Sequence, residues 1–248
     1  MRIAGLDLGQ AQDPSALAMV ERDQWPEGRY GPIDDRTRVV ALRQWPLDTD
    51  YTELADEVLG YGMDALVVEV NGPGRPMLDL LRRQARKSGF KGRVHGTVTA
   101  PSSVRPKLIQ DEAKGRIVVV PKGELIYAIN ELQRRGAFFE CSKCGTILPA
   151  PEMNCPQTLR NKRTGELVPC PGKSKKVGGS LVVPEALETQ WRMTVEQMKV
   201  FEQRQNDMGN ISFGGRGKYH HCDLVIALGI ACWWLNRMFS RRNLAIMW

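Results

Sequence analysis

Long hydrophobic runs are missing from this sequence of 248 residues. Its most apolar stretch, residues 224–235, is shorter than the roughly 20 residues that a membrane-spanning helix needs. The opening "MRIAGLDLGQ" has neither a basic leader nor a long apolar core, so we expect no secretory signal. We therefore expect a cytoplasmic protein without a membrane partner, in which cysteines are reduced or bind metal.

Nucleotide-binding patterns are also missing. A phosphate-binding loop would read G-x-x-x-x-G-K-[ST], but Gly172, Lys173 and Ser174 follow Leu167 where that loop needs a glycine. The stretch "GLDLGQ" resembles the first hairpin of actin-like ATPases and sugar kinases. That fold needs a second half and an Asp-Gly-Gly motif, which this sequence lacks. Neither an ATPase motor nor a sugar kinase is expected.

The composition is that of an ordinary globular protein, 42% hydrophobic and 25% charged, with enough apolar residues for a sizeable core. The net charge is +7 and the isoelectric point about 9.2. A basic balance of this size favours a polyanionic partner, such as a nucleic acid.

The order of the predicted elements indicates the fold class. Three strands in a row come first, followed by a helix, a strand, a helix, a strand and further helices. The strands are predicted at 2–9, 15–21, 37–46, 65–70 and 93–100, and the main helices at 51–62, 77–89, 122–136, 185–203 and from 223 onward. This order predicts an α/β, ribonuclease H-like mixed sheet, with three antiparallel strands and then parallel strands, flanked by helices.

Three acidic residues stand where a charge is costly. Asp7 lies inside the first strand, Glu69 inside "ALVVEV", and Asp223 at the start of the apolar helix. An ionised carboxylate in a dry core costs several kcal/mol unless it is paired or binds a metal. If the first strand and the strand at 65–70 are neighbours, all three carboxylates can converge on one site.

Oxygen ligands of this kind favour two Mg²⁺ or Mn²⁺ ions, and such a pair promotes phosphodiester cleavage. Taken singly, each acid has a simpler interpretation: Asp7 as an acid satisfied by a turn or a cap, Asp223 as a helix cap or first-turn acid, and Glu69 as the partner of an arginine. Asp13, His220 and His221 are possible accessory residues of the same site. Asp13 can equally cap a turn, and either histidine can equally cap the helix or lie at the surface.

Four of the six cysteines lie close together, with the spacing Cys141-x2-Cys144-x10-Cys155-x14-Cys170. Four thiolates suit one structural, tetrahedral Zn²⁺, and the turn "CSKCG" is typical of a zinc knuckle. The second half lacks the C-x2-C of a regular ribbon, so free or oxidised cysteine pairs are the alternative. Cys222 and Cys232 are expected to be buried as small apolar side chains.

The cysteines define an expected insertion. We predict a ribonuclease H-like domain formed by residues 1–140 and 180–248, interrupted at 141–179 by a zinc-ribbon-like insertion with four cysteine ligands. Seven Lys or Arg and two Glu give residues 141–180 a charge of +5. The insertion can contact a DNA backbone, dock a packaging partner or serve structure alone. The predicted DNA contacts are Arg160, Lys162, Arg163, Lys173, Lys175 and Lys176.

Four stretches together resemble the nuclease domain of phage terminase large subunits, which is related to RuvC-type resolvases. They are "GLDLGQAQDPSALAMVE", "LVVEVNGPGRPMLDLLRR", "VPKGELIYAINELQRRGAFF" and "HHCDLVIALGIACWW". The resemblance implies that Asp7, Glu69 and Asp223 are the catalytic acids of a two-metal nuclease. The family commonly has His-Asp-Asp before its late helix, whereas this sequence has Cys222 before a single aspartate.

The resemblance implies an endonuclease that cuts double-stranded phage DNA during genome packaging, in the cytoplasm of the bacterial host. Terminase large subunits also have an ATPase motor, for which this sequence contains no motif. The motor is then a separate partner, a packaging ATPase or other terminase component, or the chain is an isolated domain or a stand-alone nuclease. Two alternatives stay open: a RuvC-like Holliday junction resolvase, and a zinc-containing DNA-binding scaffold without catalysis.

Overall fold

A computed structural model of the chain describes fourteen stretches of residues. They are 1–9, 13–22, 37–71, 74–101, 104–112, 115–134, 139–141, 143, 147–148, 158–161, 165–176, 181–205, 211–214 and 222–239. The chain divides into two compact units. The first comprises Met1–Arg22, Arg38–Asn130 and Val183–Trp248, and the second Asp23–Thr37 and Glu131–Val182. The predicted insertion lies within the second unit, and its bounds stay a prediction.

A mixed sheet forms the centre of the first unit, with the strand order β3-β2-β1-β4-β5-β7-β6. β1 pairs with β2 antiparallel and with β4 parallel, and β5 and β7 continue the parallel part. The strands are β1 (Arg2–Asp7), β2 (Ala16–Arg22), β3 (Thr37–Gln44), β4 (Ala65–Glu69), β5 (Arg93–Ala100), β6 (Lys107–Glu112) and β7 (Gly115–Pro121). This mixed sheet, flanked by helices, confirms the predicted fold class.

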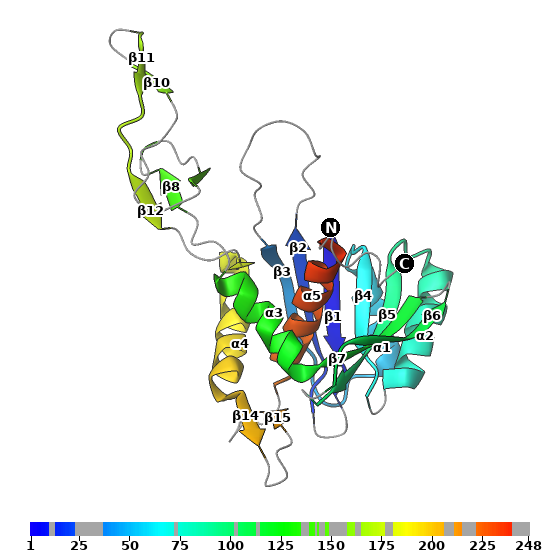
Figure 1. The fold of residues 1–248 in the computed structure, drawn as a ribbon. Helices are drawn as coiled ribbons and strands as arrows, with labels where there is room; N and C mark the ends of the chain where they lie inside the picture. Colours follow the sequence, from blue (N-terminus) through cyan, green and yellow to red (C-terminus); the bar gives the residue numbers. More distant parts are fainter. Residues whose placement is uncertain are drawn as a thin grey trace. The chain divides into compact units, whose positions relative to one another are not determined.

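Helices flank the sheet, as Figure 1 shows for the first unit. They are α1 (Tyr51–Gly60), α2 (Gly74–Ser88), α3 (Lys122–Arg134), α4 (Glu188–Val200) and α5 (Asp223–Phe239), and a short 3-10 turn, Glu185–Leu187, precedes α4. The apolar core on one face of the sheet combines Ala4, Leu6 and Val68 with residues of α1 and α2. No helix among the described residues is both long and apolar enough to cross a membrane.

Helix α5 lies on the other face, along β1. A Cβ atom added to Gly5 would lie 2.1 Å from the backbone oxygen of Ala227, so glycine is what allows this close approach. Every residue of α5 from Asp223 to Leu235 is buried. Its far end is held by Arg22, whose guanidinium donates a hydrogen bond of 3.1 Å to the Asn236 side chain. The apolar helix is therefore a core element that runs antiparallel to β1.

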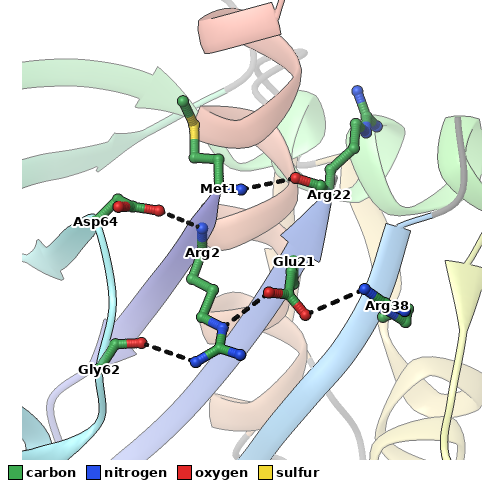
Figure 2. Close-up of polar contacts among 7 residues, drawn as sticks. All are labelled: Met1, Arg2, Glu21, Arg22, Arg38, Gly62 and Asp64. Atoms are coloured by element: carbon green, nitrogen blue, oxygen red, sulfur yellow. Dashed lines mark hydrogen bonds and ion pairs between the residues drawn. The ribbon is translucent and has the colours of Figure 1, made fainter. Parts of the chain in front are cut away.

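The start of β1 is tied to its neighbours by polar contacts (Figure 2). The Met1 ammonium donates to the Arg22 carbonyl at 2.8 Å, and the Arg2 amide donates to the Asp64 carboxylate at 2.7 Å. Glu21 accepts from Arg2 at 2.9 Å and from Arg38 at 3.4 Å. Ion pairs this exposed contribute at most about 1 kcal/mol each, so they fix the strand edge more than they stabilise the fold.

Three differences from the predicted elements stand out. β6 and β7 were not predicted. After α4, β14 (Glu202–Gln205) and β15 (Ile211–Gly214) pair as an antiparallel hairpin, where no strand was predicted. The predicted helix at 185–203 is the short 3-10 turn followed by α4, which ends at Val200.

The second unit contains short strands. They are β8 (Phe139–Cys141), β9 (Ile147–Leu148), β10 (Thr158–Arg160), β11 (Leu167–Pro169), β12 (Ser174–Lys176) and β13 (Leu181–Val182). β12, β8 and β9 form one small sheet and β10 and β11 another. Sheets this small bury little apolar surface, which is the condition under which a metal stabilises a fold.

Candidate active site

Asp7 and Glu69 lie side by side at the carboxyl ends of β1 and β4. The two strands pair in parallel, and Leu6 opposite Val68 is the last pair of their register, so the next residues are Asp7 and Glu69. The pKa of Asp7 is well above its ordinary value. Burial is the main cause, followed by the Glu69 charge, a side-chain hydrogen bond with Glu69 and the Asp223 charge. Close carboxylates disfavour each other's ionisation.

Glu69 is held by two polar neighbours. Its Oε1 accepts a hydrogen bond from the Thr99 hydroxyl on β5 and another, of 3.2 Å, from the Asn71 amide. The same Asn71 amide donates to the Thr99 carbonyl at 3.0 Å. Glu69 is buried, with 9% of its surface exposed. These contacts fix the Glu69 carboxylate beside Asp7.

Asp223, the first residue of α5, is buried near the same place. Its pKa is raised to about 7, mainly by burial and next by the Asp13 charge, with a smaller effect of Glu69. Hydrogen bonds that the carboxylate accepts from the Asp223 backbone amide and from the Gln44 side chain lower this pKa. The Gln44 contact, from β3, is 3.4 Å long. The sheet and α5 therefore bring the three predicted acids together, with Asp13 near Asp223.

The start of α5 is capped by another helix. Gln197 of α4 accepts a hydrogen bond of 3.1 Å from the Leu224 amide through its side-chain oxygen. Its backbone oxygen accepts from the Cys222 thiol at 3.7 Å. Burial raises the pKa of that thiol to about 11, so it keeps its proton at neutral pH. Asp223 is an acid in the first turn of α5, which is one of the two simpler interpretations of its position. Its carboxylate also accepts a hydrogen bond from Gln44.

Lys122 is a cation of this site that the sequence did not reveal. It is the first residue of α3 and follows β7 directly. Its charge lowers the pKa of Asp7, against the effects of burial and of the two other acids. The available signal was the apolar run of residues 117–120, because a strand there places the next residue at the carboxyl edge of the sheet.

The donor set suits a hard divalent cation, since it consists of carboxylate oxygens and the adjacent thiol is protonated. Asp7 and Glu69 form the close pair, and Asp223 acts on Asp7 through its charge. No three His, Cys, Asp or Glu side chains among the described residues are close enough to hold one ion together.

Several predicted site residues lie outside the described residues. They are Cys144, Cys155, Lys162, Arg163, His220 and His221. Cys141 ends β8, and Cys170 is buried just after β11. Arg160 is in β10, Lys173 precedes β12, and Lys175 and Lys176 lie in β12. The zinc and the DNA contacts stay predictions. Cys222 and Cys232 are buried, as predicted.

Comparison with known proteins gives similar solved structures. No family model matches the chain, and no curated protein matches it. The similar structures include terminase nucleases. The large terminase nuclease from thermophilic phage G20c has 14% sequence identity and a TM-score of 0.48, covering 93% of this chain and 80% of that one.

A mutant nuclease domain of the large terminase subunit gp2 of bacterial virus Sf6, with manganese and beta-thujaplicinol, has 15% identity and a TM-score of 0.48. The match covers 93% of this chain and 87% of that one. RuvC of Thermus thermophilus has 16% identity and a TM-score of 0.26, covering 39% and 62%. The fold assignment itself rests on the strand order and register of the sheet described above.

Proposed function

We propose that this chain is a nuclease that uses Mg²⁺ or Mn²⁺ to cut phosphodiester bonds in DNA. The observation that carries the proposal is the meeting of Asp7, Glu69 and Asp223 at one edge of the sheet, where burial and mutual charge raise the pKa of Asp7 and of Asp223. A fold keeps such an unfavourable set of acids at the expense of stability. Clustered groups with perturbed pKa values are typical of functional sites.

Asp7, Glu69 and Asp223 would supply the oxygens that hold the metal ions. Two such ions supply an activated water and stabilise the leaving oxygen. Thr99 and Asn71 keep the Glu69 carboxylate in one orientation, and Gln44 does the same for Asp223. Lys122 adds a positive charge near Asp7. This charge would stabilise the negative charge that develops on a substrate phosphate during cleavage.

DNA as the substrate is supported by the charge of the chain. The net charge is +7, and residues 141–180 contribute a large part of it. Lys and Arg that contact phosphates give affinity without reading the base sequence. Within this proposal the basic residues of the insertion hold the DNA backbone, and Cys141, Cys144, Cys155 and Cys170 hold one structural Zn²⁺.

The finer role is DNA cleavage during phage genome packaging, in the cytoplasm of an infected bacterium. Its support is the resemblance of four sequence stretches to terminase nucleases. ATP hydrolysis would then come from a partner, either a packaging ATPase or another terminase component.

The test is cleavage of supercoiled plasmid by the purified protein in Mg²⁺ or Mn²⁺. We expect nicked and linear products that disappear with EDTA and in Asp7→Asn. Asp79→Asn is the matched control, because Asp79 is exposed on α2. No cleavage of plasmid or of a four-way junction, by folded protein in either metal, would contradict the proposal and favour a DNA-binding scaffold.

A further inference from the structure

Gln197 joins two helices at the point where the proposed metal site begins. The first four backbone N–H groups of a helix have no partner inside the helix. In α5 the Leu224 amide donates to the Gln197 side-chain oxygen at 3.1 Å. Cys222, the residue before the helix, is not one of the Ser, Thr, Asp or Asn residues that usually cap a helix N-terminus, and here the acceptor comes from α4.

The same residue holds the chain on both sides of Asp223. The Gln197 side chain binds the amide of residue 224, and its backbone oxygen accepts from the thiol of residue 222. Gln197 is 3% exposed, so water offers little competition for either contact. The backbone around Asp223 is therefore set by Gln197, and the carboxylate end by Gln44.

Charge explains why a neutral acceptor suits this position. A glutamate could accept from the same amide, and a helix N-terminus favours negative charge. It would, however, add a further negative charge to Asp13, Glu69, Asp7 and Asp223, which already act on one another. An amide oxygen completes the cap without that repulsion.

We propose that Gln197 is a positioning residue, which sets the affinity of the site for divalent cations by fixing the start of α5 and with it the Asp223 carboxylate. This inference rests on the proposed function. Residues that orient metal ligands from the next layer out typically change metal affinity by about 10- to 100-fold when they are replaced.

The experiment measures Mn²⁺ binding by calorimetry without DNA, together with thermal unfolding. Gln197→Met keeps the approximate volume of the side chain and removes the acceptor. Thr194→Val is the matched control, because Thr194 is equally buried on α4 and its hydroxyl donates only within that helix, to the Gln190 carbonyl at 2.8 Å. We expect Mn²⁺ to bind about tenfold more weakly to Gln197→Met and unchanged to Thr194→Val.

Gln197→Asn provides a second variant if Gln197→Met does not fold, since its amide is one methylene too short for the Leu224 contact. If the folded variant bound Mn²⁺ with the affinity of the wild type, the proposed role of Gln197 would be wrong, even if the melting temperature changed. The nuclease proposal would not be affected. Wild-type protein that binds no Mn²⁺ would overturn both.

Discussion

Asp223 shows how a single carboxyl group links stability to pH. Its pKa is about 7 in the fold, against an ordinary value of 3.8, because it is buried near other acids. Between these two values the folded protein holds more protons than the unfolded one, so stability falls as the pH rises. Above pH 7 Asp223 is ionised in both the folded and the unfolded protein, and the loss of stability caused by its buried charge no longer changes with pH.

This gives a prediction for the metal-free protein. In EDTA, the melting temperature of the wild type should fall from pH 5 to pH 7 more steeply than that of Asp223→Asn. The expected contribution is up to about 1.4 kcal/mol per pH unit. Scanning calorimetry of both proteins at several pH values measures it. If the melting temperatures of the two proteins changed equally with pH, Asp223 would not be protonated in the folded protein.

The predicted acids could be found from sequence because they interrupt apolar stretches. Asp7 and Glu69 lie within apolar strands, and Asp223 begins an apolar helix, so each can be identified from its local sequence. Gln44 and Gln197 cannot be identified in this way, because a glutamine in a strand or on a helix of mixed polarity is usually an ordinary surface residue. Their roles depend on partners 179 and 27 residues away in the chain.

At the scale of elements, Gly5 decides how closely α5 packs on β1. A Cβ added there would lie 2.1 Å from the Ala227 oxygen and 2.9 Å from the Ala231 nitrogen. Both are backbone atoms and cannot move without shifting the helix. Because Asp7 follows Gly5 on the same face of β1, a shift of α5 would also separate Asp223 from Asp7.

We predict that Gly5→Ala loses about 1–3 kcal/mol of stability through overpacking. Gly60→Ala is the control, because nothing lies within 4 Å of a Cβ added at the end of α1. That change should be neutral or stabilise by up to about 1 kcal/mol. Urea unfolding of the two variants decides the point, and equal stability would mean that α5 adjusts freely.

The elements that were missed have a physical explanation. β7 contains the run Ile117–Val120, which is typical of a parallel strand buried on both faces, but such a run has no alternation to identify it. β6 is an edge strand with a bulge between Leu108 and Gln110, and Leu108 and Ile109 are exposed. Because β7 was not predicted, the role of Lys122 at its end was missed too.

At the scale of the whole molecule, the second unit differs from the first in what can stabilise it. The first unit has a large sheet and a continuous core. In its described residues the second has strands of two or three residues, and a metal bound to four cysteines would stabilise such small sheets. The Lys and Arg side chains of residues 141–180 would serve the proposed contact with DNA.

Zinc content tests this part of the account. We expect one Zn²⁺ per chain in the purified wild type, most of it lost in Cys170→Ser. Cys232→Ala should keep its zinc, because Cys232 is fully buried in α5. Mass spectrometry of the metals after dialysis gives the count. A zinc-free wild type, or a full complement in Cys170→Ser, would remove the predicted zinc site.

The most direct test of the central claim is the number of Mn²⁺ ions bound by the wild type and by Asp7→Asn, from the loss of the free Mn²⁺ signal in electron paramagnetic resonance. The account predicts two ions per wild-type chain, with binding lost or strongly weakened in Asp7→Asn. It would be contradicted if the folded wild type bound no Mn²⁺, or if Asp7→Asn bound as many ions with the same affinity.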